Sequence, residues 1–507
     1  MDFVVPRFSA IALLPALVLV YWIPLTIYRI YLHPLSRFPG PKLAASTSLY
    51  SHYFNFVRGG NFIRHLEYLH DEYGPIVRTH PNELHIRDIE AYSTVFKVGS
   101  RFEKDARFYG FPFEGSHFSM VTLKQAKPRR DLLQPRLSKS AIDNAQHVVE
   151  MSVWRFIELL DRHRIHDEIV DLSLAYRCVT ADVLLGYAFH SPFEALDYPR
   201  FNYPPAMHMD AALMASFLAK NFRLLFTLIW NLASCLPRPL LRCLGISFIF
   251  DIQDVRHFSL PLHSTTCAHV PVRKQDDQLL YPTMLDVLMD PDTEKFGPPL
   301  PIRDLVSEAV VLLFAGSEAT SLTLTLGTFY TLNNRHVLET LQDELSHAIP
   351  DKRKLPPLDT LRGLPYLTGI IKEALRFSLG APGKLPRITP DEGAFLCGRW
   401  IPPKTALSLS HWVYHFDPTI FPDPKTFRPE RWVNDRNGDL DRYLLSFSRG
   451  SRSCIGINLA YAELYILLAA FFTNFRPVLR GTSEEDMEIR DYYAPMCNGH
   501  LKVALGV

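Results

Sequence analysis

The stretch from Phe447 to Gly456, FSRGSRSCIG, places one thiol in a glycine-containing, cationic loop. An apolar, helix-like run, INLAYAELYILLAAFFTNF, follows it directly. Cys454 is therefore expected just before a helix, where exposed N–H groups and nearby arginines stabilise an anion. Because most lone cysteines are small buried apolar residues, two interpretations remain: a structural thiol, or a thiolate that binds a metal.

The other residues of this loop favour the second interpretation. Gly450 permits a tight turn and a close approach to a flat ligand. Arg452 can pair with a carboxylate of a bound group, and Gly456 would let the next helix come close to the ligand plane. With Phe447, the pattern is F-x-x-G-x-R-x-C-x-G, and it resembles the cysteine loop of the cytochromes P-450, the haem-thiolate monooxygenases.

The resemblance implies haem b as the cofactor, with Cys454 as the thiolate ligand of its iron. Arg387 in KLPRITP matches an arginine that contacts a haem propionate, and Arg130 in KPRRDLLQPRLS matches a second propionate contact. Many members of the family carry Trp or His four residues before the latter arginine. Here that residue is Ala126, so this position does not supply a hydrogen bond to the haem edge.

A second motif predicts a structural ion pair. Glu373 and Arg376, in EALR, are spaced i, i+3 on one face of a predicted helix over 364–379. In the family this pair is buried with an arginine from a later loop, and Arg431 in FRPERW occupies the matching place. The resemblance gives these three residues the role of fixing the cysteine loop.

The long apolar run over 305–330 predicts a buried helix. Its segment AGSEATS, residues 315–321, resembles the family element in which small residues make room for dioxygen beside the iron. Ala315 and Gly316 match the small positions, and Glu318 matches the acid of an acid–alcohol pair that relays protons.

The alcohol is displaced by one residue. The usual threonine position is Ala319, and Thr320 follows it, which rotates the side chain by about 100° around the helix. Proton transfer by Thr320, by Ser317, or by ordered water with Glu318 all remain open. Thr320 and Ser321 could instead donate hydrogen bonds back to the helix carbonyls.

The surrounding elements predict a mainly α protein with small β-sheets, and the resemblance implies the cytochrome P-450 fold. Short strand-like pieces lie near 74–86 and 398–410. No strong internal linker interrupts residues 43–507, which we expect to form a single catalytic domain. Two aromatic-rich regions, 100–120 and 200–250, are mostly expected in the core, and a minority of their residues could line an apolar pocket or contact lipid.

Residues 1–32 predict a membrane anchor. The run from Phe8 to Tyr28 carries no charge and would span roughly 30 Å as a helix. Arg29, Arg37 and Lys42 follow, so the body of the protein is expected on the cytosolic side. Residues 33–42 are proline-rich and predict a stiff hinge. We expect a single-pass protein of the endoplasmic reticulum membrane.

Composition excludes several other classes. The 507 residues contain 54 Lys+Arg and 53 Asp+Glu, without a basic stripe, which argues against nucleic-acid binding. Seven scattered cysteines without a C-x-x-C pair argue against a zinc site. The sequence contains neither a nucleotide-binding fingerprint nor a G-x-S-x-G or H-E-x-x-H hydrolase motif.

The segments KDARFYGF and TADVLLGYAF resemble those of fungal members of the family in the endoplasmic reticulum. Many of these members modify secondary metabolites such as terpenoids and polyketides. The implied reaction inserts one oxygen atom of O2 into an apolar small molecule. Electrons would come from NADPH through a separate cytochrome P-450 reductase, with cytochrome b5 as a further candidate donor. Two alternatives remain: a haem-thiolate isomerase or dehydratase that does not use O2, suggested by Ala319, and a non-catalytic haem-binding membrane protein.

Overall fold

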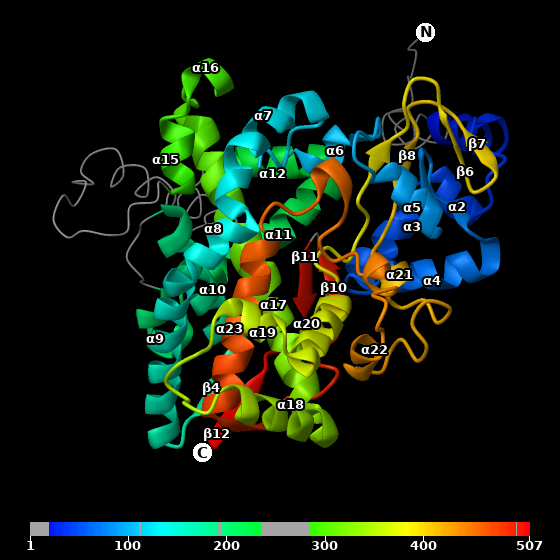
Figure 1. The fold of residues 1–507 in the computed structure, drawn as a ribbon. Coiled ribbons are helices and arrows are strands. Elements are labelled where there is room, and N and C mark those ends of the chain that lie inside the picture. Colours follow the sequence, from blue (N-terminus) through cyan, green and yellow to red (C-terminus); the bar gives the residue numbers. More distant parts are fainter. Residues whose placement is uncertain (1–19, 111–112, 190–194, 235–282, 493, 507) are drawn as a thin grey trace, which may run out of the picture.

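A computed structural model describes residues 20–110, 113–189, 195–234, 283–492 and 494–506. Helices dominate this part of the chain (Figure 1). The long helices are α4 (Phe62–Tyr73), α7 (Leu123–Leu133), α9 (Gln146–Ile165), α10 (Leu172–Phe189), α11 (Pro204–Asn221), α12 (Arg223–Ser234), α17 (Ile302–Asn333), α18 (Arg335–Ala348), α20 (Pro365–Ser378) and α23 (Ile457–Asn474). The shorter helices are α2 (Lys42–Ser46), α3 (Leu49–His52), α5 (Ile89–Val95), α6 (Ala106–Tyr109), α8 (Lys139–Asn144), α15 (Met284–Met289), α16 (Thr293–Phe296), α19 (Leu358–Arg362), α21 (Trp412–His415) and α22 (Glu430–Val433).

The strands form small sheets. A five-stranded sheet has the order β1-β2-β8-β5-β3, a three-stranded sheet has the order β4-β12-β9, and two hairpins pair β10 with β11 and β6 with β7. Their bounds are β1 (Ile76–His80), β2 (Glu83–Ile86), β3 (Glu103–Lys104), β4 (Ile169–Asp171), β5 (Arg387–Ile388), β6 (Ala394–Leu396), β7 (Arg399–Ile401), β8 (Ala406–Ser408), β9 (Arg476–Leu479), β10 (Ile489–Tyr492), β11 (Ala494–Cys497) and β12 (Lys502–Gly506).

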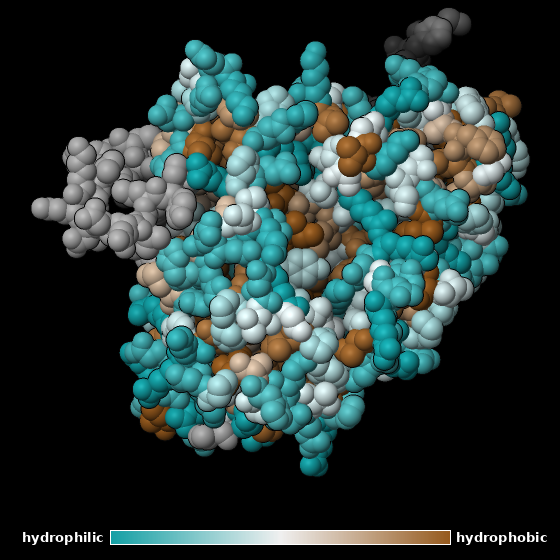
Figure 2. Space-filling view, viewed as in Figure 1, coloured by the Kyte–Doolittle hydropathy of each residue, from teal (hydrophilic) through white to brown (hydrophobic). Residues whose placement is uncertain are grey.

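Helix α17 runs through the middle of the molecule and packs against α10, α20 and α23. In Figure 1 the helices α9, α10, α23 and α18 form one side of the molecule, and the five-stranded sheet with α2, α4 and α5 forms the other. A single cluster of buried apolar side chains extends from Leu35 to Leu505. Polar side chains cover most of the face in Figure 2.

Local sequence explains the helix ends next to the site. Thr122 and Gln125 form a capping box at the start of α7. Pro365 occupies the first turn of α20, where its missing N–H costs nothing. The same helix ends at Ser378, and the next residue, Leu379, has a left-handed φ of 67°. The chain then passes close to the backbone of Ser446, just before the cysteine loop.

The predicted fold class, mainly α with small sheets, is confirmed, as are the buried helix over 305–330 and the helix over 364–379. Both strand-like regions contain the predicted strands. Residues 1–19 lie outside the described part of the chain, so most of the predicted anchor lies outside it too; residues 20–27 are helical. Three described helices, α10, α17 and α23, are long and apolar enough to cross a membrane, but most of their residues are buried inside the protein.

Candidate functional site

A cavity of about 670 Å³ lies between α17 and the cysteine loop. Cys454, Ala315, Thr320, Arg387 and Arg130 all line it, so the structure brings the separate sequence motifs together around one space. The side chains of Phe108, Tyr109, Phe118, Phe217 and Phe314 contribute apolar surface. Phe111 lies outside the described residues, and Phe113 packs against Phe118 and Phe314.

Cys454 follows a single 3₁₀ turn, Gly450–Arg452, and precedes α23. Its N–H donates to the Phe447 carbonyl at 2.8 Å, which closes the loop. The residue is exposed by surface area, but this surface faces the cavity, and the thiol is shielded from bulk water. Burial raises the pKa of the Cys454 thiol, and the Gly456 N–H and the Arg130 guanidinium offset only part of this effect.

This pKa bears on the sequence interpretation, in which a metal and positive charge together hold the thiolate. The helix N-terminus and the nearby arginine do not suffice to hold Cys454 as a thiolate against the cost of burial. A metal cation at the sulfur would supply the missing stabilisation, because coordination deprotonates a thiol outright.

The two glycines of the loop have different roles. Gly450 has a φ of +68°, and a Cβ there would lie 1.9 Å from the Phe96 carbonyl oxygen. The absent side chain therefore permits a close approach to the end of α5, not to a flat ligand as the sequence analysis expected. A Cβ at Gly456 would meet nothing within 4 Å, which leaves open space beside the start of α23.

Several cationic side chains line the cavity wall, and four of them are Arg130, Arg387, Arg452 and Lys104. Arg130 donates to the Ser453 carbonyl at 2.9 Å, and Arg387 donates to the Tyr109 hydroxyl at 2.6 Å. Arg452 donates to backbone carbonyls, including that of His117 at 3.2 Å. Within the described part of the chain, none of the four forms an ion pair with a carboxylate.

This charge distribution is a test of whether haem fits. These cations lie around one cavity and repel one another, and burial makes their charge costly unless an anion is present. A haem carries two carboxylates and an iron that accepts a thiolate. The unpaired cations, the cavity-facing thiol and the open space at Gly456 together fit such a group.

Helix α17 presents small and polar residues to the cavity. Ala315 is exposed to this space. Gly316 also lines it, but a Cβ there would lie 2.9 Å from a Leu184 methyl group, so this glycine chiefly permits α10 to pack closely. This is a different reason from the one expected, which was room beside the haem iron.

The hydroxyl groups near the cavity on α17 differ in whether they donate a hydrogen bond to a helix carbonyl. Ser317 donates to the Leu313 carbonyl at 2.7 Å, and Ser321 donates to the Glu318 carbonyl at 3.0 Å. Thr320 is buried and lines the cavity, and its hydroxyl forms no hydrogen bond with a described residue. The predicted hydrogen bond from the hydroxyl back to a helix carbonyl is therefore present for Ser321 and absent for Thr320.

Glu318 forms part of an ionic triad that the sequence did not indicate. Arg177 on α10 lies 3.1 Å from a Glu318 carboxylate oxygen and donates to both oxygens of Asp210 on α11, at 2.7 and 2.8 Å. Burial raises the pKa of Glu318 to about 7; Arg177 lowers it, and the negative charge of Asp210 raises it. The carboxyl can therefore exchange protons near neutral pH.

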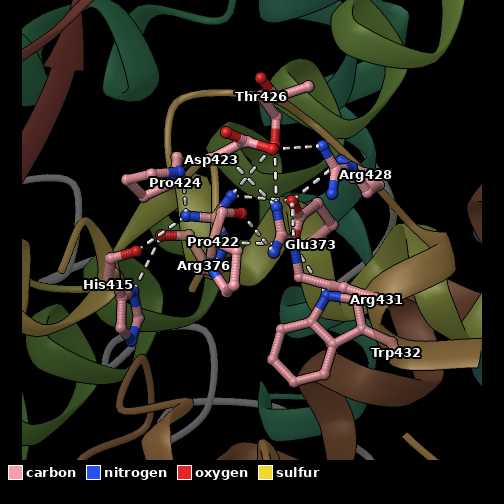
Figure 3. A network of polar contacts seen from close by, with 10 residues as sticks. All are labelled: Glu373, Arg376, His415, Pro422, Asp423, Pro424, Thr426, Arg428, Arg431 and Trp432. Carbon is pink, nitrogen blue, oxygen red and sulfur yellow. Dashed lines mark hydrogen bonds and ion pairs between the residues drawn. The ribbon is translucent and has the colours of Figure 1, made fainter. Parts of the chain in front are cut away.

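The predicted Glu373–Arg376 pair is fully buried, outside the lining of the cavity, in a network of polar contacts (Figure 3). The two side chains form two hydrogen bonds of 2.7 and 3.0 Å, and Arg431 Nε lies 3.1 Å from the same carboxylate. Trp432 Nε1 donates to Glu373 at 2.8 Å, and the Arg428 N–H donates at 2.9 Å. Burial alone would raise the pKa of Glu373, but the two arginines outweigh it and hold it below its usual range.

A buried histidine connects this network to the loop. His415 Nδ1 donates to the Arg376 carbonyl at 2.8 Å, and His415 Nε2 accepts from the Leu445 N–H at 2.8 Å. The second contact fixes Nδ1 as the donor. Ser446 Oγ adds a bond of 2.7 Å to the Leu375 carbonyl. Helix α20 is thus tied to the two residues that precede Phe447.

Sequence analysis also missed a buried cluster, of which His117 lines the cavity. Glu308 on α17 accepts from the His117 N–H at 2.6 Å and from Arg129 at 2.7 Å, and its second oxygen lies 2.7 Å from His117 Nδ1. Burial alone would raise the pKa of Glu308, but His117 and Arg129 together lower it. The three residues come from distant segments, and no spacing pattern connects them.

Comparison with known proteins gives a consistent result. The family model described as Cytochrome P450 matches residues 41–496. Cytochrome P450 monooxygenase BOT1 of Botryotinia fuckeliana is 31% identical over 497 residues, which cover 97% of this chain and 95% of the relative. Cytochrome P450 monooxygenase MO6277 of Ascocoryne sarcoides is 33% identical, covering 96% of both chains. Cytochrome P450 monooxygenase astB of Talaromyces wortmannii is 34% identical over 91% of this chain and 87% of the relative.

Proposed function

The chain belongs to the cytochrome P450 family of oxidoreductases, and we propose that it is a haem-thiolate monooxygenase that inserts one oxygen atom of O2 into an apolar small molecule. The observation that carries this proposal is the position of Cys454, which lines a cavity that Arg130, Arg387 and Arg452 also line. The names of the relatives support the reaction class, and their fungal origin supports a substrate from secondary metabolism.

Cys454 would bind the haem iron, and Arg130, Arg387 and Arg452 would neutralise the haem carboxylates. When bound, haem supplies the redox-active iron, and a thiolate ligand favours cleavage of the O–O bond of dioxygen. Phe447, Gly450 and Gly456 shape the loop that presents the sulfur. The buried network of Glu373, Arg376 and Arg431 would act structurally, because His415 transmits its position to the start of that loop.

The residues of α17 that line the cavity would control the space for a ligand and the transfer of protons. Ala315 leaves room on the cavity side of α17, and Gly316 also lines the cavity. Glu318, with a pKa of about 7, is suited to pass protons near neutral pH. Thr320 is the hydroxyl best placed to receive them, because Ser317 is occupied by the Leu313 carbonyl.

We further propose residues 1–32 as a single membrane anchor, residues 33–42 as a hinge and residues 43–507 as one catalytic domain facing the cytosol from the endoplasmic reticulum membrane. The uncharged run at Phe8–Tyr28 and the basic residues after it support this arrangement. Electrons would come from NADPH through a separate reductase, with cytochrome b5 as a further candidate donor.

The carbon monoxide difference spectrum of the reduced protein tests the proposal. A strongly red-shifted Soret band is expected for the wild-type protein, and Cys454→Ala should abolish it, because only a thiolate opposite carbon monoxide gives that band. Cys397→Ala changes a partly buried cysteine far along the chain from the loop and should leave the band unchanged. A thiolate band that persists in Cys454→Ala would refute the assignment of the ligand.

The reaction type needs a second measurement. With a reductase and a substrate that shifts the haem spectrum, product formation should require both O2 and NADPH. Product formed without oxygen and NADPH would identify an isomerase or dehydratase instead. Bound haem without any substrate-dependent NADPH consumption would identify a non-catalytic haem-binding protein.

A further inference from the structure

His117 lies in the loop between α6 and α7 and lines the cavity, with an exposed fraction of 6%. Its Nδ1 lies 2.7 Å from one Glu308 oxygen, and its backbone N–H donates to the other oxygen at 2.6 Å. Glu308 itself is fully buried and is not part of the cavity lining. The His117 ring therefore stands between the cavity and a carboxylate in the wall behind it.

Glu308 fixes which ring nitrogen of His117 carries a hydrogen. Burial raises the pKa of Glu308, but His117 and Arg129 outweigh it and lower the pKa below its usual value, so this carboxylate is ionised. An ionised carboxylate can only accept hydrogen bonds, and Nδ1 must therefore donate across the 2.7 Å contact. In a neutral imidazole one nitrogen is a donor and the other is an acceptor, so Nε2 is left as the acceptor.

The Nε2 atom of His117 faces the cavity. It forms no hydrogen bond with a described residue, and it is not one of the fully buried side-chain atoms that lack a partner. Its accessible surface lies on the cavity side, because Glu308 covers the Nδ1 edge of the ring. Two other histidines of the cavity lining, His85 and His411, differ in that both ring nitrogens of each are within hydrogen-bonding distance of a protein atom.

The side chains next to this acceptor are aromatic. Phe118 follows His117 directly, and both Phe118 and Phe314 on α17 line the cavity. Phe113 packs against both of these rings. A polar atom beside such an apolar surface orients a ligand, because burying the atom without a hydrogen-bond partner costs free energy.

We propose that His117 is a specificity-determining residue whose Nε2 accepts a hydrogen bond from a hydroxyl group of the substrate. The inference rests on the proposed function and names its substrate class, an apolar skeleton that already carries an alcohol or phenol group. An ether, an ester or a carboxylate offers no hydrogen to this nitrogen and would leave it without a partner. A reaction that installs a hydroxyl group, such as a hydroxylation or the reduction of a carbonyl, must therefore supply the substrate.

The competing explanation is a purely structural role, in which His117 ties its loop to α17 and Nε2 contacts no ligand. Two substitutions separate these roles. His117→Phe keeps an aromatic ring without nitrogens, and Glu308 retains Arg129 and the backbone N–H of residue 117 as partners. His117→Asn keeps a side-chain donor for Glu308 but removes the acceptor from the cavity. His347→Phe is the control, because it changes an exposed histidine on α18.

The probes are the three isomeric phenylphenols and their methyl ethers, so that the members of each pair differ in whether the oxygen carries a hydrogen. Equilibrium dialysis against the purified haem-containing protein measures each Kd at about pH 8, where an imidazole ordinarily carries no charge. The wild-type protein should bind at least one phenol roughly two- to tenfold more tightly than its ether, which is the contribution of one neutral hydrogen bond. Both His117 variants should lose this preference and retain their affinity for the ether, and His347→Phe should keep the preference.

Three outcomes would overturn the inference: no phenol is preferred by the wild-type protein, the preference survives in a folded His117 variant, or phenol and ether lose affinity equally. The second outcome would assign the hydroxyl group to another partner, and the third would show that His117 acts by packing. If His117→Phe does not fold, His117→Asn alone decides.

Failure of the proposed function gives a different result. In that case the wild-type protein itself lacks a thiolate band with carbon monoxide. A normal thiolate band without a preference for any phenol refutes only the role of His117.

Discussion

Replacing Arg177 by methionine should raise the pKa of Glu318 and change the pH range in which this carboxyl exchanges protons. Arg177 lies 3.1 Å from the Glu318 carboxylate, and both side chains are mostly buried, with exposed fractions of 17% and 11%. Two unit charges about 4 Å apart interact by roughly 4 kcal/mol at an effective dielectric constant near 20. One pH unit corresponds to about 1.4 kcal/mol, so the upper limit of the shift is roughly three units.

The expected shift is smaller than this limit because Arg177 also serves Asp210, whose exposed fraction is 33%. We expect the Glu318 midpoint to rise by roughly one to two pH units from its value of about 7 in Arg177→Met. Asp210→Asn removes a repelling negative charge and should move the midpoint to lower pH. The two substitutions therefore act in opposite directions on the same carboxyl.

Infrared titration between pH 5 and about pH 9 would measure these midpoints through the band of the protonated carboxyl group. Loss of the band in Glu318→Gln assigns it. Arg155→Met is the control, because Arg155 forms an exposed ion pair with Asp197 and should leave the midpoint in place. A midpoint that falls in Arg177→Met, or that shifts the same way in Asp210→Asn, would refute the electrostatic account of the triad.

Three further predictions concern the loop and the cavity. Glu373→Gln should lower the free energy of unfolding in urea by about 3–5 kcal/mol, because it leaves buried arginines without their anion. Lys372→Gln, on the same helix, breaks an ion pair with the exposed Asp441 and should cost about 0–1 kcal/mol. Equal costs would contradict the network's role. Gly450→Ala should prevent haem incorporation, because the new Cβ would overlap the Phe96 carbonyl oxygen after α5. Gly481→Ala is the control, because it adds only backbone strain of about 1–2 kcal/mol. Thr320→Ala should increase the share of NADPH electrons released as hydrogen peroxide, and unchanged coupling would move the relay to Glu318 and water.

The sequence predicted the helices and the motif residues because each depends on local order. The apolar period of 305–330 and the i, i+3 spacing of Glu373 and Arg376 are properties of one segment, and the structure contains the helix and the ion pair. The triad of Arg177, Asp210 and Glu318 depends instead on how three helices cross. Residues so far apart in the chain produce no periodic pattern. A single sequence contains no other indication that they are in contact.

Glycine positions illustrate a second limit. Sequence analysis assigned the small residues at 316 and 450 to the space around a ligand, but the atoms nearest to a Cβ there belong to Leu184 and to the Phe96 backbone. The absence of a side chain indicates that something approaches closely. It does not indicate what approaches, because a neighbouring helix and a cofactor impose the same requirement on that residue.

The thiol and the cations of the cavity make opposite electrostatic demands, which one ligand can satisfy. Burial favours the neutral form of Cys454, so its sulfur needs a cation, whereas Lys104 and its neighbouring arginines need an anion. Direct pairing satisfies neither side, since the Arg130 guanidinium offsets only part of the cost at the thiol. A ligand with a metal at its centre and carboxylates at its edge meets both demands. Haem binding and folding of this region should therefore be coupled, because each makes the other's buried charges less costly.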